Sequence, residues 1–453
     1  MGRWTGTVLA GALCMALAGC AGGGTGQEGP AEPAERPQVE INVACPPLTM
    51  AYDEEHPDAE VFDLLQEAAE DFSASYGDAD VTFNFAKYQY VDEKEQVIDK
   101  FGTPEAADVI IGGSFNLPTY IREERVAPLD DVIDDGLRSD IDEAIWEQAT
   151  YDGKTYAIPY YYLQNTLAVN ADLMRAAGLE RFLTEDGSIA QWSVDDFNEI
   201  LADLRASMTE PGSFPLAFYA ANNQGDTHTM TLLRAFGSPQ YDADGFFDFS
   251  APEGVQALAW IAELNEREYI PKGAENIEFA ETVALFNSGQ VALCPSNMVN
   301  VRTAEQEQGM DVALANFPNV AGNGLATSYL NGFSVLDNGD EAKVKAAKDF
   351  VRFIYSDENY LRYSLAGVPV VKSYVEKHAD EVPYMQAYSD NAGNTVDIIN
   401  GTVNWEGVRA AFYPNIQDLL RGTKSPEEAA AGIDEGCNAA IREGLDAIEE
   451  VQR

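Results

Sequence analysis

The sequence predicts an α/β protein of two lobes, each a sheet flanked by helices. The chain has 453 residues, of which 45% are hydrophobic, which is too long for one ordinary domain and enough to fill two cores. Strand-like and helix-like runs alternate in its first third, as in a parallel sheet covered by helices. A β-rich run between residues 152 and 177 is interrupted by Pro159. Because proline cannot donate a ladder hydrogen bond, we interpret this run as a crossover between two bodies and not as a strand in mid-sheet.

The N-terminus has the features of an export leader. Arg3 precedes an apolar stretch at 7–18 that is too short to span a membrane as a helix, and Leu17-Ala18-Gly19-Cys20 follows. This pattern resembles a bacterial lipoprotein signal, which implies that Cys20 is lipidated, with an ordinary cleaved signal as the alternative. Residues 21–38 are rich in Gly, Pro and Glu, which predicts a disordered tether of about 23 Å. No later apolar run is long enough to cross a membrane.

The charge balance argues against several classes of function. The chain has 28 basic and 76 acidic residues, a net charge of −48, so we expect no binding to nucleic acid. Three cysteines lie beyond the leader, namely Cys45, Cys294 and Cys437. Their odd number and their spacing predict buried thiols and not disulfides or a metal site. No nucleophile, zinc or nucleotide motif is present, so we predict no cofactor, no metal and no catalysis.

The first lobe is expected to begin with alternating strands and helices. Their expected bounds are 39–44, 58–75, 81–85, 91–101 and 107–111. In such a sheet ligands bind beyond the carboxyl ends of the strands. The loops 46–55 and 112–118 follow two of these ends, which places Tyr52, Phe115 and Asn116 near any cleft.

The central crossover carries a resemblance to a known family. It contains, in order, Gly153-Lys154, Tyr156, Pro159-Tyr160, an apolar strand at 166–169 that ends in Asn170, and a helix that ends at Gly178. This ordered set resembles the hinge of extracellular solute-binding proteins of ABC importers, and it is most similar to the carbohydrate-binding, maltose-binding-like type.

Later segments extend the resemblance. Residues 282–297 are similar to a helix, a strand and a ligand-facing turn of that family, although the turn has Asn297 where a tryptophan is common. Residues 329–335, which include Asn331, resemble the strand that returns to the first lobe. Helices are expected at 194–208, capped by Ser193 with Asp196, at 252–268 behind a Ser250 capping box, at 341–355, and after Ser425.

The resemblance implies a periplasmic-binding-protein-like fold and a binding function. Residues 39–158 with 331–373 would form lobe 1, and residues 159–330 with 374–453 would form lobe 2. The protein would be a monomer, held by its lipid on the extracytoplasmic face of the cell membrane. It would capture a sugar or oligosaccharide between its lobes and deliver it to the permease subunits of an ABC transporter.

Aromatic residues are the best candidates for contacts to a sugar. Sugars present flat C–H faces and hydroxyls, so their sites combine aromatic rings with hydrogen-bonding groups. Adjacent residues of a strand alternate in direction, so at least one of Tyr160, Tyr161 and Tyr162 should face the cleft, and we favour Tyr161. Trp405 resembles the family's aromatic platform at a helix start, and its polar neighbours favour an exposed ring, with core packing as the alternative. The predicted ligand-binding set is Trp405, Tyr161, Tyr160, Phe115, Asn116, Tyr52, Asn297 and Asn331.

Two other functions compete with this interpretation. The acidic excess suits a polyamine as the ligand of the same fold. Paired carboxylates such as Asp130-Asp131 or Asp195-Asp196 suit a secreted glycoside hydrolase, which needs two carboxyl groups about 5 to 10 Å apart. With so many acidic residues such pairs arise by chance, and their positions at helix starts explain several of them.

Overall fold

The computed structural model describes residues 36–48, 59–88, 93–113, 115–221, 226–378, 384–399 and 401–451. The predicted leader, Cys20 and most of the tether lie outside these residues, and so does Tyr52. Among the described residues, no helix is both long and apolar enough to cross a membrane.

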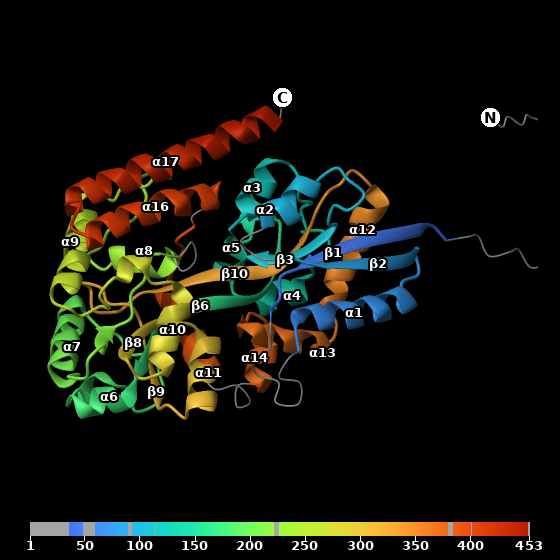
Figure 1. Ribbon diagram of the computed structural model, residues 1–453. Coiled ribbons are helices and arrows are strands. Elements are labelled where there is room, and N and C mark those ends of the chain that lie inside the picture. Colours follow the sequence, from blue (N-terminus) through green and yellow to red (C-terminus); the bar gives the residue numbers. More distant parts are fainter. Residues whose placement is uncertain are drawn as a thin grey trace, which may run out of the picture.

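The chain forms two lobes, which lie to the right and the left in Figure 1. The sheet of the first lobe has the strand order β2-β1-β3-β10-β6. These strands are Asp80–Lys87, Gln38–Cys45, Val109–Gly113, Ala326–Val335 and Ile158–Asn170. The first three are mutually parallel, as the sequence predicts, and β10 returns antiparallel to β3.

Helices cover both faces of this sheet. On one face, α1 (Val61–Ser75) and α12 (Glu341–Ile354) contact the sheet and each other. Apolar side chains of β1 alternate toward this face, because successive residues of a strand point in opposite directions. On the other face, α3 (Leu117–Arg122) and the chain after α2 (Glu93–Gln96) enclose a smaller apolar cluster.

The strand β6 belongs to both lobes. Its first half pairs with β10 and β11 (Val368–Pro369), and its second half pairs with β8 (Val291–Ser296) and β9 (Val312–Ala315). The crossover is therefore confirmed, and Figure 1 shows β6 and β10 running between the lobes. The expected lobe boundaries within these shared strands stay predictions.

The expectation that the run around Pro159 is not a strand in mid-sheet is wrong, because β6 lies between β10 and β8. Pro159 is the second residue of β6 and lies opposite Gly332 of β10. The register of the two strands shifts between Asn331 and Gly332. A proline near the start of a strand, at an irregularity of the ladder, loses no required hydrogen bond.

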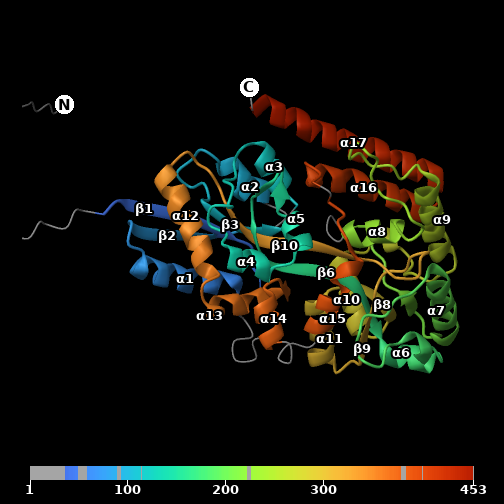
Figure 2. The ribbon, with the colours of Figure 1, turned by 180° about the vertical axis from the view of Figure 1, so that it is seen from behind.

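The second lobe is mainly helical. Its sheet adds β7 (Phe214–Leu216), parallel to β8. The helices α9 (Pro252–Glu266), α16 (Trp405–Leu420) and α17 (Pro426–Val451) pack together on one side. Figures 1 and 2 show α17 extending toward the first lobe, where it contacts α3.

The remaining elements connect these units. In the first lobe they are η2 Ile98–Lys100, α4 Asp135–Asp140, α5 Glu143–Glu147, β4 Thr150–Tyr151, β5 Lys154–Thr155, α13 Glu358–Leu361, η5 Arg362–Ala366 and α14 Lys372–His378. In the second they are α6 Ala171–Ala176, η3 Glu180–Phe182, α7 Val194–Ser207, α8 Asp226–Leu233, η4 Ala274–Asn276, α10 Phe279–Asn287, α11 Met298–Gln308, α15 Met385–Asp390, η6 Asn391–Asn394 and β12 Thr395–Val396.

Helix caps can be checked directly. The capping pair of Ser193 and Asp196 is confirmed at α7, and Ser425 with Glu428 forms the same pair at α17. The capping box expected at Ser250 is wrong, because the N-cap of α9 is Ala251.

Candidate functional site

Trp405 is the first residue of α16. Asn404 caps this helix with a left-handed backbone (φ 54°), and its side chain accepts a hydrogen bond from the backbone of Gly407. The predicted helix start is confirmed, but the predicted exposure is wrong, because only 2% of Trp405 is exposed. Its indole Nε1 donates to Asp226 Oδ2 at 2.7 Å, so the ring turns inward while Glu406 faces solvent.

Asp226 connects two side chains of α16. It is the first residue of α8, is 1% exposed, and also accepts a 2.7 Å hydrogen bond from Arg409 Nε. Trp405 and Arg409 are four residues apart and therefore lie on the same face of the helix. A buried carboxylate is stable only with such partners, so Asp226 fixes both side chains in place.

A residue of the first lobe completes this group. The ring of Phe115, between β3 and α3, lies 5.9 Å from the ring of Trp405 and 5.1 Å from that of Tyr329 on β10. The guanidinium of Arg409 lies 5.8 Å from the centre of the Phe115 ring, within the range of a cation–π contact.

Two phenols share this environment. Burial, and then the charge of Asp226, raises the pKa of Tyr329 to about 12. The pKa of Tyr413 is raised well above its ordinary value by the same two causes in the same order, with Arg409 acting against them. Both hydroxyls therefore stay protonated and can donate hydrogen bonds. We name the whole group the Asp226 cluster; its members are Phe115, Asp226, Tyr329, Trp405, Arg409 and Tyr413.

The cluster has the chemistry of a site for neutral, hydroxyl-rich molecules. It combines aromatic rings with hydroxyl and guanidinium groups, the kinds of group that bind the C–H faces and hydroxyls of sugars. Its negative charge, on Asp226, is compensated by Arg409. Among the described residues of the cluster there is one carboxylate and not a pair.

Tyr160 and Tyr161 do not lie at this cluster. Both are fully buried, because the strand that carries them runs inside a sheet covered on both faces. The hydroxyl of Tyr160 donates to the carbonyl oxygen of Tyr360, and the ring of Tyr161 fills the space above Gly367. Tyr162 is buried in the same core. The expectation that Tyr161 points into a cleft is therefore wrong.

The predicted asparagines have structural roles in this conformation. Asn297 precedes α11, and its Oδ1 accepts a hydrogen bond from the backbone of Asn300 at 3.2 Å. Asn331 is fully buried beside the register shift of β10. Asn116 hydrogen-bonds to the buried carboxyl of Glu93, whose pKa burial raises. Of the predicted residues that the structure describes, Phe115 and Trp405 are brought together in the cluster.

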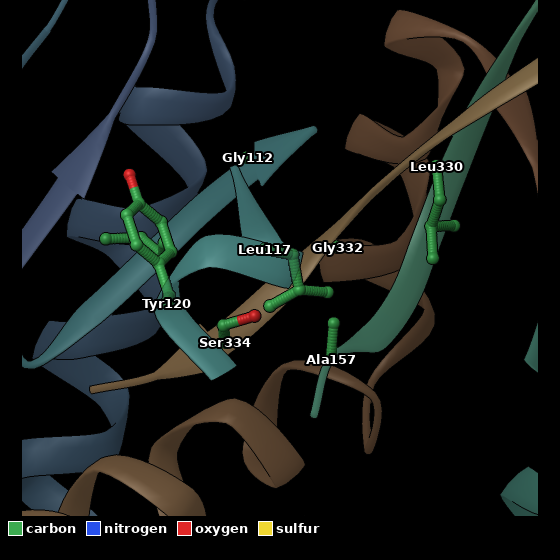
Figure 3. Close-up of a pocket in the computed structure, with 8 residues that line it drawn as sticks. Gly112, Leu117, Tyr120, Ala157, Leu330, Gly332 and Ser334 are labelled. Carbon is green, nitrogen blue, oxygen red and sulfur yellow. The ribbon is translucent and has the colours of Figure 1, made fainter. Parts of the chain in front are cut away.

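A small cavity lies nearby in the first lobe (Figure 3). Its volume is about 10 Å³, and its lining residues are Ile110, Gly112, Leu117, Tyr120, Ala157, Leu330, Gly332 and Ser334. This space holds about one water molecule. It is too small for a sugar, so we do not assign the ligand to it.

Sequence reasoning missed four members of the cluster, namely Asp226, Tyr329, Arg409 and Tyr413. The four-residue spacing of Trp405 and Arg409 was a usable signal, because it places both side chains on one helix face. Asp226 carried no signal, since nothing in the sequence separates it from the other acidic residues.

Comparison with known proteins defines the class. The sequence pattern of the family described as bacterial extracellular solute-binding protein matches residues 57–360, more than half of the chain. The chain therefore belongs to this family. Its two-lobed α/β architecture is the maltose-binding-protein fold.

Individual relatives are distant. The chain is 23% identical, over 66% of its length, to an uncharacterized lipoprotein of Streptomyces antibioticus, and 28% identical, over 37% of its length, to a mannitol-binding protein of Pseudomonas aeruginosa. It spans 65% and 35% of the lengths of these two proteins. The structure of the cyclic α-maltosyl-1,6-maltose-binding protein of Arthrobacter globiformis matches with a TM-score of 0.70 and 19% identity, covering 90% of this chain and all of that one.

Proposed function

We propose that this protein captures a neutral sugar or oligosaccharide between its lobes and delivers it to the permease of an ABC importer. The family supports the capture of a solute outside the cell. A sugar is supported by the chemistry of the Asp226 cluster and by the ligands of two similar proteins, which are described as binding mannitol and a cyclic maltose derivative.

One observation carries the proposal. Phe115 of the first lobe meets Trp405 and Arg409 of the second, so the cluster is assembled from both lobes. A ligand bound there contacts both lobes and favours the closed arrangement by its differential affinity for it. Binding followed by hinge closure is then the mechanism, and the closed monomer is the form that the permease receives.

Calorimetry with a ligand panel tests this proposal. We expect maltose, cyclic α-maltosyl-1,6-maltose or mannitol to bind, and spermidine and putrescine not to bind. Arg409→Met should weaken binding of the active sugar at least about tenfold, or 1.4 kcal/mol, since it removes a hydrogen-bonding group and uncovers the charge of Asp226. Arg421→Met is the matched control, because Arg421 pairs with Asp418 at the exposed end of the same helix.

The two competing functions give different results in the same panel. Heat of binding with spermidine alone would favour the polyamine, although the carboxylate of the cluster already has a cation as partner. Release of product from an oligosaccharide would favour the hydrolase, which needs a second carboxylate beside Asp226. Either result would overturn the proposal.

We further propose that Cys20 carries a lipid that holds the protein at the membrane. The resemblance of residues 17–20 to a lipoprotein signal supports this, and so does the similar Streptomyces lipoprotein. Cys20→Ala should release the protein into the medium, because an acidic body has no other attraction for an anionic surface. Cys14→Ala, a change to the other cysteine of the leader, should leave it in the membrane fraction. Unchanged fractionation of the Cys20 variant would refute the anchor.

A further inference from the structure

The strand β6 carries three consecutive polar residues at its centre. Gln164, Asn165 and Thr166 are at most 2% exposed. The pairing of β6 with β10 ends at Asn165, and its pairing with β8 begins at Thr166. These residues therefore lie where the strand passes from one lobe to the other. Buried polar groups need hydrogen-bond partners. The partners of these three residues therefore show which segments are attached to the strand at this point of the hinge.

Gln164 and Thr166 connect β6 to α15 and η6. Gln164 Nε2 donates to the carbonyl oxygen of Tyr388 at 3.1 Å, and its Oε1 accepts from Asn391 Nδ2 at 2.6 Å. Thr166 Oγ1 lies 3.1 Å from the hydroxyl of Tyr388. Both side chains lie on one face of the strand, as residues two apart must.

Asn165 points to the opposite face and reaches the Asp226 cluster indirectly. Its Nδ2 donates to Thr327 Oγ1 at 3.1 Å and to Thr227 Oγ1 at 3.3 Å. Thr327 is its partner across the ladder in β10 and lies two residues before Tyr329. Thr227 directly follows Asp226 in α8. A single amide thus joins the hinge strand to β10 and α8, which supply Tyr329 and Asp226 to the cluster.

We propose that Asn165 is a positioning residue that couples the hinge to the ligand site. It fixes the start of α8 relative to β6 and β10, and Asp226 in turn fixes Trp405 and Arg409. A change in the twist of β6 at the lobe boundary then moves the carboxylate that orients the platform. The meaning for ligand capture rests on the proposed function, but the coupling itself can be observed without any ligand.

The test uses the indole N–H resonances of the full protein labelled with ¹⁵N-tryptophan. Trp405→Phe identifies the Trp405 signal. Trp146, Trp192 and Trp260 donate to acceptors elsewhere and serve as references. Asn165→Leu and Thr227→Val should each shift the Trp405 signal and leave the references in place, because each breaks the link to Asp226. Thr227→Ser keeps the hydroxyl and should restore the wild-type position.

Thr166→Val is the matched control. Like Asn165→Leu, it removes a buried polar group from the centre of β6, here a hydroxyl, but on the face away from α8, so the Trp405 signal should not move. An unmoved Trp405 signal in Asn165→Leu would overturn the proposal, and so would an equal shift in Thr166→Val. Should Asn165→Leu fail to fold, Thr227→Val compared with Thr227→Ser decides the matter.

An affinity measurement with maltose connects the coupling to function. Asn165→Leu should weaken maltose binding about tenfold, and Thr166→Val should weaken it less than about twofold, for similar losses of melting temperature. Equal loss in both variants would refute a specific coupling. If the wild-type protein does not bind maltose, that result bears on the proposed sugar alone, and the resonance shifts still decide the role of Asn165.

Discussion

Among single residues, Trp405 combines burial with a place in the proposed ligand site. Its nitrogen edge is held by Asp226 and its ring meets Phe115 of the other lobe. A ring held in this way would lose little side-chain entropy on binding the proposed sugar. The same anchoring makes Trp405 part of the hydrophobic core of the second lobe.

Trp405→Ala should therefore destabilise the ligand-free protein by about 3 to 5 kcal/mol, as for other buried aromatic residues. Trp405→Phe keeps most of the ring contacts and loses the hydrogen bond, so it should cost about 1 to 3 kcal/mol. Urea unfolding of both variants checks the order. An alanine variant as stable as the wild type would show that the ring contributes nothing to the core.

His228, two residues after Asp226, predicts a pH dependence. Burial lowers its pKa to about 3, against about 6.5 in the unfolded chain. Between these two pKa values the unfolded state binds a proton that the folded state does not, so stability falls as pH falls from about 6.5, by up to about 1.4 kcal/mol per unit. Above that range His228 contributes no slope.

His228→Gln isolates this contribution. A glutamine can still accept the hydrogen bond that Tyr219 shares with His228, so the variant should fold. Urea unfolding between pH 4.5 and 7.5 should show a slope smaller by up to one proton below pH 6. Identical slopes in the two proteins would mean that His228 is protonated equally in both states.

At the scale of elements, features that depend on local sequence patterns were predicted better than features that depend on contacts between distant residues. Alternation and helical periodicity identify β1, α1 and α7, because burial on one face leaves its period in the sequence. The capping box at Ser250 fails because Asp434, far away in α17, accepts the backbone N–H groups of Phe249 and Ser250. No local pattern contains that partner.

The candidate site shows the same difference between local patterns and distant partners. Phe115 was predicted to lie near a cleft because loops at the carboxyl ends of strands meet at one edge of a sheet. Tyr161 was misplaced because alternation gives the direction of a side chain but not what covers that face. Asp226 could not be found because its two partners lie in α16, about 180 residues later.

The register shift between β6 and β10 depends on a glycine. A Cβ on Gly332 would lie 2.6 Å from the carbonyl oxygen of Ile158, a backbone atom that cannot move aside easily. Gly332→Ala should therefore destabilise the protein by about 1 to 3 kcal/mol, as overpacking does. Gly393→Ala has nothing within 4 Å of the new methyl group and is the control. Equal melting temperatures of these two variants would contradict the tight approach.

At the scale of the whole molecule, the two lobes share strands and not merely a linker. A hinge of this kind limits the relative motion to bending at a few strand positions. With a bound sugar, the radius of gyration in X-ray scattering should fall and the melting temperature should rise. Arg409→Met with the same sugar at the same concentration should show a smaller change. A tightly bound sugar that leaves the scattering curve unchanged would exclude closure.

The shared strand β10 also constrains the order in which the chain can fold during synthesis. Val335 of β10 pairs with Val109 of β3. This edge of β3 therefore stays unpaired until the whole chain between the two residues has been made. The sheet of the first lobe stays open at that edge while most of the second lobe emerges. Pairings between such distant segments form slowly, so the first lobe is completed only after β10 has been made and has paired with β3.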